Sequence, residues 1–240
     1  MENEASSVAS PIVETLFSVG AHYGYKKSRR HPSVSPYIFG VKNRVEIFDL
    51  VQTSALFERA KEYVRSLGAA GKTMLFVGTK FEAKEAVRAG ALEAGQPFVV
   101  ERWIGGALTN LSEIRKRVNR LETLRSGRES GEFDKYTKKE RLLLDREIAQ
   151  LEKNFGGIVA MAALPAVLFV VDPREESTAL REAKRMKIPV VALASSDCDI
   201  TNIAYPIVGN DAARGSITFF VNEIAKAYQE SKTNVGSVVV

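Results

Sequence analysis

The sequence is poor in the residues that build most catalytic and metal sites. Among its 240 residues it has one cysteine, Cys198, and only two histidines, His22 and His31. A single cysteine excludes an internal disulfide, and one thiol with two imidazoles does not make a convincing metal set. No base or nucleophile partners Asp172, the acid best placed at a strand end. We therefore predict no catalytic residue, no metal and no cofactor.

Long apolar runs are missing as well. No run reaches the roughly 18 residues that a membrane helix needs, and the N-terminus lacks the basic-then-apolar pattern of a secretory signal. We expect a soluble, cytoplasmic protein with no membrane partner. Residues 1–10 are expected to be disordered and residues 231–240 to form a flexible tail.

The apolar residues that are present, 45% of the chain, follow an alternating strand and helix pattern. Three short runs are apolar on both faces, at 73–77, 167–171 and 189–193. Amphipathic helices are expected beside them at 80–94, 175–186 and 211–230. Buried strands that alternate with helices indicate a parallel sheet covered on both sides. Earlier elements are a helix over 11–19, strands over 37–39 and 45–48, and a helix over 49–67.

Residues 109–155 interrupt this pattern. Leucine, isoleucine and valine recur there at three- and four-residue steps in two stretches, separated by a Gly/Ser turn over 126–132. Thr137 and Glu140 have the spacing of a capping box for the second stretch. The pattern predicts an inserted antiparallel coiled-coil hairpin that projects from an α/β core domain over 11–108 and 156–230.

Positive charge gathers near the N-terminus. Residues 20–44 carry six lysines and arginines and no acid, whereas the net charge of the whole chain is +5. Glycines and prolines punctuate this segment, and rings stand among its cations. Cations that meet phosphates, with rings that stack on exposed bases, are the mixture that RNA binding requires. A flexible basic loop without a partner is the alternative.

Two other motifs could bind phosphate. Residues 102–110, RWIGGALTN, pair two glycines with Thr109 or Asn110 as a helix cap, which leaves N–H groups at a positive helix end. An ordinary turn with a buried tryptophan is the alternative.

Residues 76–80, FVGTK, end a strand at the sheet edge where α/β proteins bind ligands. However, Ser66 stands where a phosphate-binding P-loop needs glycine, which favours an ordinary strand-to-helix turn.

Taken in order, these motifs resemble the bacterial-type ribosomal protein S-two family over nearly the whole chain. The matching stretches are GAHYG at 20–24, PYIFG at 36–40, FDL at 48–50, FVGTK at 76–80, RWIGGALTN at 102–110, TKKE at 137–140, FGGI at 155–158 and GND at 209–211. The resemblance implies a flavodoxin-like fold, a place in the small ribosomal subunit, binding to small-subunit rRNA and contacts with neighbouring proteins. It also implies a role in docking the mRNA-binding ribosomal protein S-one.

Residue types and resemblance together define the predicted RNA-binding set. Its members are His22, Tyr23, Lys26, Lys27, Arg29, Arg30, His31, Lys42, Asn43, Arg44, Lys80, Arg102, Trp103, Gly105, Gly106, Thr109, Asn110, Arg115 and Lys116. One competing hypothesis is an α/β enzyme that binds a nucleotide or sugar phosphate at the FVGTK edge and the RWIGG turn. Another is an adaptor that acts only through its hairpin.

Overall fold

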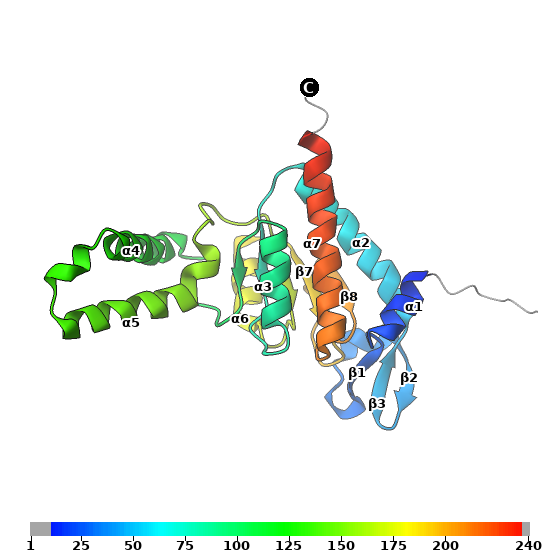
Figure 1. Cartoon of the computed structure of the whole chain (residues 1–240). Helices are drawn as coiled ribbons and strands as arrows, with labels where there is room; N and C mark the ends of the chain where they lie inside the picture. The colour runs from blue at the N-terminus through cyan, green and yellow to red at the C-terminus, as the bar shows by residue number, and fades with distance from the viewer. Residues whose placement is uncertain (1–10, 237–240) are drawn as a thin grey trace, which may run out of the picture.

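The fold is built on a five-stranded sheet in which every neighbouring pair of strands is parallel (Figure 1). The computed structural model describes residues 11–236, so the prediction for residues 1–10 lies outside it. The strands are β4 (Met74–Val77), β5 (Phe98–Val99), β6 (Val167–Val171), β7 (Val190–Ala194) and β8 (Tyr205–Val208), in the spatial order β5-β4-β6-β7-β8. Counted within this sheet alone, the order is 2-1-3-4-5, which is the flavodoxin-like arrangement.

Helices cover both faces of the sheet, which confirms the predicted three-layer α/β fold. On one face, alternate strand residues such as Phe76 and Phe169 pack against α1 (Pro11–Ser18), α2 (Leu50–Ala69), α3 (Lys84–Glu93) and α7 (Arg214–Gly236). On the other face, Leu168 and Val170 pack against α6 (Ser177–Met186) and the base of the hairpin. The sequence pattern missed β5, which has two residues, and β8, where Pro206 interrupts the apolar run.

A second, antiparallel sheet lies beside β8 and α2. It contains β1 (Tyr23–Lys26), β3 (Val45–Phe48) and β2 (Ile38–Lys42), in that spatial order, with two short 3-10 helices, η1 (Lys27–Arg29) and η2 (Pro32–Tyr37), between β1 and β2. The strands predicted at 37–39 and 45–48 correspond to β2 and β3, but β1 was not foreseen. The basic segment is therefore an ordered small sheet with connecting turns.

The predicted inserted hairpin is present and projects from the core (Figure 1). It consists of α4 (Leu111–Glu129), η3 (Glu132–Lys135) and α5 (Lys138–Phe155), and η4 (Gly156–Ile158) follows it. Leu121 and Leu151 belong to the apolar seam between the two long helices. Thr137 and Glu140 form the expected capping box at the start of α5. No helix within residues 11–236 combines the length and the apolar character needed to cross a bilayer.

Helix α7 corrects one domain boundary. It continues to Gly236, so the predicted flexible tail is wrong for residues 231–236. The helix persists because it packs closely along α2, where a Cβ on Gly68 would lie 2.4 Å from the carbonyl oxygen of Tyr228. Such a contact is far inside the van der Waals limit, so glycine allows the two backbones to approach at this point.

This close approach predicts that Gly68→Ala destabilises the protein even though alanine is the better helix former. Overpacking against a backbone carbonyl costs about 1–3 kcal/mol, which outweighs a propensity gain of about 1 kcal/mol. Urea unfolding should show a lower midpoint for this variant. Gly105→Ala is the matched control, because nothing lies within 4 Å of its added Cβ. Equal stability of the two variants would contradict this packing account.

Candidate nucleic-acid interface

Four cations gather at one end of the small sheet. Lys26 of β1 and Lys42 of β2 both pair with Val45 of the central strand β3, from opposite sides. The Cα atoms of these two lysines are therefore about 10 Å apart, two strand spacings. Arg44 lies in the β2–β3 turn, and its carbonyl oxygen accepts a hydrogen bond from the N–H of Lys27 at 3.1 Å. We call Lys26, Lys27, Lys42 and Arg44 the cationic tip.

The side chains of the cationic tip are exposed, and within residues 11–236 none of them forms an ion pair. Asn43 and Arg44 occupy the two turn positions with φ of 53° and 66°. Both values are positive, as a tight two-residue hairpin turn requires. The short turn therefore fixes the backbone of Arg44 close to Lys42 at the end of β2.

The other two cations of the basic segment are neutralised within the protein. Arg30 Nε lies 3.3 Å from the buried carboxylate of Glu46, and Arg29 lies 3.5 Å from Asp197. The guanidinium of Arg29 also lies 4.8 Å from the centre of the Tyr25 ring. The structure thus divides the six predicted phosphate ligands into four unpaired cations and two that form ion pairs within the protein.

The two histidines are part of the packing. His22 is buried and stacks on Phe17 with ring centroids 4.4 Å apart, and burial lowers the pKa of its imidazole. His31 accepts a hydrogen bond from the N–H of Ser33 and begins η2. Tyr23, which lies 4.0 Å from the His22 ring, keeps half of its surface exposed. Of these three rings, His22 is buried, whereas Tyr23 and His31 are both partly open to solvent.

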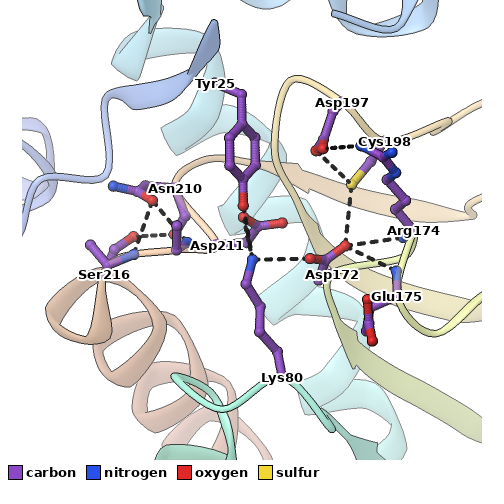
Figure 2. Close-up of polar contacts among 12 residues, drawn as sticks. Tyr25, Lys80, Asp172, Arg174, Glu175, Asp197, Cys198, Asn210, Asp211 and Ser216 are labelled. Carbon is purple, nitrogen blue, oxygen red and sulfur yellow. Dashed lines mark hydrogen bonds and ion pairs between the residues drawn. The ribbon is translucent and has the colours of Figure 1, made fainter. Parts of the chain in front are cut away.

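Lys80 joins the small sheet to the large one. Its ammonium lies 3.0 Å from Asp172 Oδ2, 3.1 Å from Asp211 Oδ1 and 3.0 Å from Tyr25 Oη (Figure 2). Tyr25 comes from β1, while Lys80, Asp172 and Asp211 follow the carboxyl ends of β4, β6 and β8. Burial alone would lower the pKa of Lys80, but the carboxylates and the hydroxyl raise it above its usual range. The charge of Lys80 is thus used inside the protein.

This network occupies the sheet edge where flavodoxin-like proteins bind ligands. Asp172, Cys198 and Asp211 place possible metal-ligand atoms within 4.8 Å of one another. However, the positive charge between the two carboxylates belongs to Lys80. Burial also raises the pKa of the Cys198 thiol, which keeps it protonated and unreactive. The edge is therefore closed by internal ion pairs, and the hydrogen bond of Lys80 to Tyr25 connects it to the small sheet.

A second internal acid fills the turn before the hairpin. Glu182 of α6 is buried, and its carboxylate accepts hydrogen bonds from the Trp103 indole at 3.0 Å and the Gly106 N–H at 2.8 Å. The Leu108 N–H at 3.0 Å and the N–H and hydroxyl of Thr109 at 3.2 Å also donate to it. The predicted phosphate site at this turn is thus corrected, because a protein carboxylate already binds these donors. Asn110 begins α4, but its side chain makes no capping hydrogen bond.

The remaining predicted residues lie near the hairpin base. Arg102, Gly105 and Asn110 are exposed. Arg115 donates to the carbonyl oxygens of Val159 and Met161, and Lys116 pairs with Glu113. Figure 1 shows the hairpin and the small sheet at opposite ends of the large sheet, so the structure does not bring these residues to the cationic tip.

The sequence did not reveal the acids that occupy the two candidate phosphate sites, the FVGTK edge and the RWIGG turn. Glu182 is the single acid of the short amphipathic helix α6, and this position alone did not indicate that its carboxylate binds the turn. Asp211 belongs to a quoted motif, but its partner Lys80 is 131 residues away in the chain. Pairing at such separations cannot be read from local spacing.

The fold and the site together define a class: an α/β scaffold with four exposed cations that have no acidic partner within residues 11–236. Comparison with known proteins gives the family. The model of the ribosomal protein S2 family matches residues 16–231. The chain therefore belongs to the ribosomal protein S2 family, whose members are structural proteins and not enzymes.

Individual relatives agree with this assignment. The small ribosomal subunit protein uS2 of Desulfovibrio desulfuricans is 43% identical over 220 residues, covering 92% of this chain and 85% of the relative. The protein of the same name from Rhodopirellula baltica is also 43% identical over 220 residues, with the same coverage. The one from Geotalea uraniireducens is 41% identical over 218 residues, covering 91% of this chain and 85% of its own.

Glu182 gives a pH-dependent prediction. Burial would raise the pKa of its carboxyl, but the indole and backbone N–H donors outweigh this and hold the pKa below its usual range. The depressed pKa stabilises the fold at pH values above the unfolded-state pKa, and this stabilisation is lost as pH falls through the folded-state pKa. Glu182→Gln should therefore unfold about 2–3 kcal/mol more easily than wild type at pH 7.

The same comparison at lower pH provides the check. The difference in unfolding free energy between wild type and Glu182→Gln should shrink below about pH 4, because there the carboxyl of the unfolded wild type takes up a proton before that of the folded state does. Glu175→Gln is a suitable control, because Glu175 is an exposed acid beside the same helix. A difference that stays constant between pH 7 and pH 3 would show that the charge of Glu182 is not what binds the turn.

Proposed function

We propose that this chain is a structural constituent of the small ribosomal subunit and binds small-subunit rRNA through its cationic tip. The observation that carries the proposal is the group of four exposed cations without acidic partners that β1, η1, β2 and the β2–β3 turn gather at one end of the small sheet. Phosphate groups of RNA neutralise such charges and release counterions, which supplies most of the binding free energy. The names of the curated relatives support the small subunit as the location.

A small-molecule enzyme is the poorer explanation of the same structure. Both positions that the sequence offered for a phosphate are filled by the protein itself, one by the network of Lys80 and one by Glu182. A substrate would have to displace buried ion pairs or hydrogen bonds, and breaking a buried ion pair costs about 3–5 kcal/mol. The cationic tip, in contrast, binds a polyanion without any rearrangement.

Reversing the cationic tip should abolish most rRNA binding. The variant carries Lys26→Glu, Lys27→Glu, Lys42→Glu and Arg44→Glu, and the probe is deproteinised small-subunit rRNA. We expect its affinity to fall roughly 100-fold at 100 mM salt. The negative slope of log affinity against log salt should become less steep by about 3. Filter binding at several salt concentrations measures both.

A control variant with the same charge change is available. Arg59→Glu, Arg65→Glu, Lys72→Glu and Arg185→Glu alter exposed cations on α2, on the turn after it and on α6, away from the tip. It should bind rRNA within about threefold of wild type. Equal losses in both variants would mean that only net charge matters, and unchanged binding by the tip variant would refute the proposal.

We also propose that the chain contacts neighbouring small-subunit proteins and helps to dock ribosomal protein S-one. The projecting hairpin is the candidate surface, because Leu142 and Leu143 of α5 are 50% and 54% exposed and lie next to a shallow hollow lined by Tyr136 and Glu147. Contiguous exposed apolar side chains that are surrounded by polar residues mark protein interaction sites. Leu142 and Leu143 do not belong to the apolar seam between α4 and α5.

A shortened hairpin tests this second role. Replacing residues 122–144 with a short Gly/Ser turn keeps the Arg120–Glu147 ion pair and the base of the seam. Small subunits that contain this variant should retain the chain but lose S-one on sedimentation. The point variant Leu142→Ser with Leu143→Ser should behave in the same way. Normal S-one content in both kinds of subunit would contradict the proposed docking role, whereas loss of rRNA binding would assign RNA contacts to the hairpin.

A further inference from the structure

Phe39 is the most exposed of the large apolar side chains in the part of the chain that the structure describes, at 81%. It lies in β2, three residues before Lys42 and five before Arg44. Within residues 11–236 its ring has no aromatic neighbour and no cation above it. Nothing in the isolated chain explains why a phenyl ring remains in solvent at this position.

Phe39 has no pairing partner in β3. Ile38 pairs with Phe48 and Gly40 pairs with Ile47, so Phe39 is the extra residue of a β-bulge on the outer strand of the small sheet. Bulges re-aim a side chain and often lie beside functional sites. A bulge, together with Lys42 at the end of the strand, also disfavours pairing with a strand of another protein.

The turn that follows carries a second unusual feature. Arg44 has φ of 66°, a conformation that favours glycine or asparagine and is unfavourable for a long side chain. Backbone strain of this kind persists where the rest of the structure holds it in place, and it often marks a binding site. Here the strained position carries one of the four unpaired cations of the cationic tip. Strand β2 and the β2–β3 turn therefore combine an exposed ring with cations at fixed positions.

We infer that Phe39 stacks on an unpaired base of rRNA whose flanking phosphates bind the cationic tip. This inference rests on the proposed function and extends it from the phosphate backbone to the bases. Charge complementarity favours RNA over a protein partner, because the only acid of the three-stranded sheet, Glu46, is buried against Arg30. Rings that stand beside cations are the usual means of holding single-stranded RNA.

Phe39→Ala in the full chain tests the inference, with deproteinised small-subunit rRNA as the probe. Stacking of one base on an aromatic ring is worth about 1–3 kcal/mol, so affinity should fall about 5- to 150-fold. The salt slope should stay unchanged, because no phosphate contact is lost. Phe39→Trp should keep affinity close to wild type, and its added fluorescence should be quenched by rRNA but not by a fully paired RNA duplex.

Phe81→Ala is the matched control. Phe81 is 72% exposed in the loop before α3, and the Arg214 guanidinium lies 5.3 Å from the centre of its ring. This variant should bind rRNA like wild type, and all three phenylalanine variants should unfold at nearly the wild-type urea concentration, because the altered rings are exposed.

The outcomes separate this inference from the function on which it rests. If reversal of the cationic tip weakens binding but Phe39→Ala behaves like Phe81→Ala, stacking is refuted and phosphate binding stands. If neither change weakens binding, the proposed function fails as well. If Phe39→Ala binds rRNA normally but assembled subunits lose a neighbouring protein, Phe39 is a protein contact and the inference is overturned.

Discussion

The ion pairs of Lys80 are the interaction on which the rest of the structure depends. They connect Tyr25 of the small sheet with acids that follow two strands of the large sheet, and all four side chains are largely withdrawn from water. Hydrogen bonds of Ser196 with Tyr25 and of Asn210 with Gly20 lie around this joint. The hydrogen bond of Lys80 to the Tyr25 hydroxyl, with those of Ser196 and Asn210, gives the small sheet one favourable orientation on the core. That orientation holds the cationic tip on a fixed support.

The same acids determine what the protein does not bind. A flavodoxin-like sheet offers a ligand edge at the carboxyl ends of its strands, and a helix end that follows paired glycines offers free N–H groups. In this chain Asp172 and Asp211 neutralise the cation at the first position, and Glu182 accepts the donors at the second. Internal contacts therefore occupy both the carboxyl edge of the sheet and the helix end, the two places where α/β enzymes bind ligands. Binding is left to the outer surface, where Lys26 and its neighbours have no acidic partner.

Local sequence patterns were sufficient for the layers of the fold and for the hairpin. Apolar runs such as residues 167–171 identify strands buried on both faces, and the Thr137 and Glu140 capping box marks the start of α5. The pattern could not reveal β1, because its short basic sequence has no apolar alternation and pairs only through β3. Nor could it separate Lys80 from the exposed lysines, since burial of Lys80 depends on Asp211, which is distant in the chain. The bulge at Phe39 likewise exists only once β2 and β3 are aligned.

The central claim is that the small sheet, and above all its cationic tip, is the surface that meets rRNA. Ultraviolet crosslinking of purified small subunits, followed by mass spectrometry of peptides that carry a nucleotide, tests it most directly. If the cationic tip binds rRNA, crosslinked peptides will be concentrated within residues 23–44. Crosslinks confined to the hairpin over residues 111–155, with none in the small sheet, would contradict it.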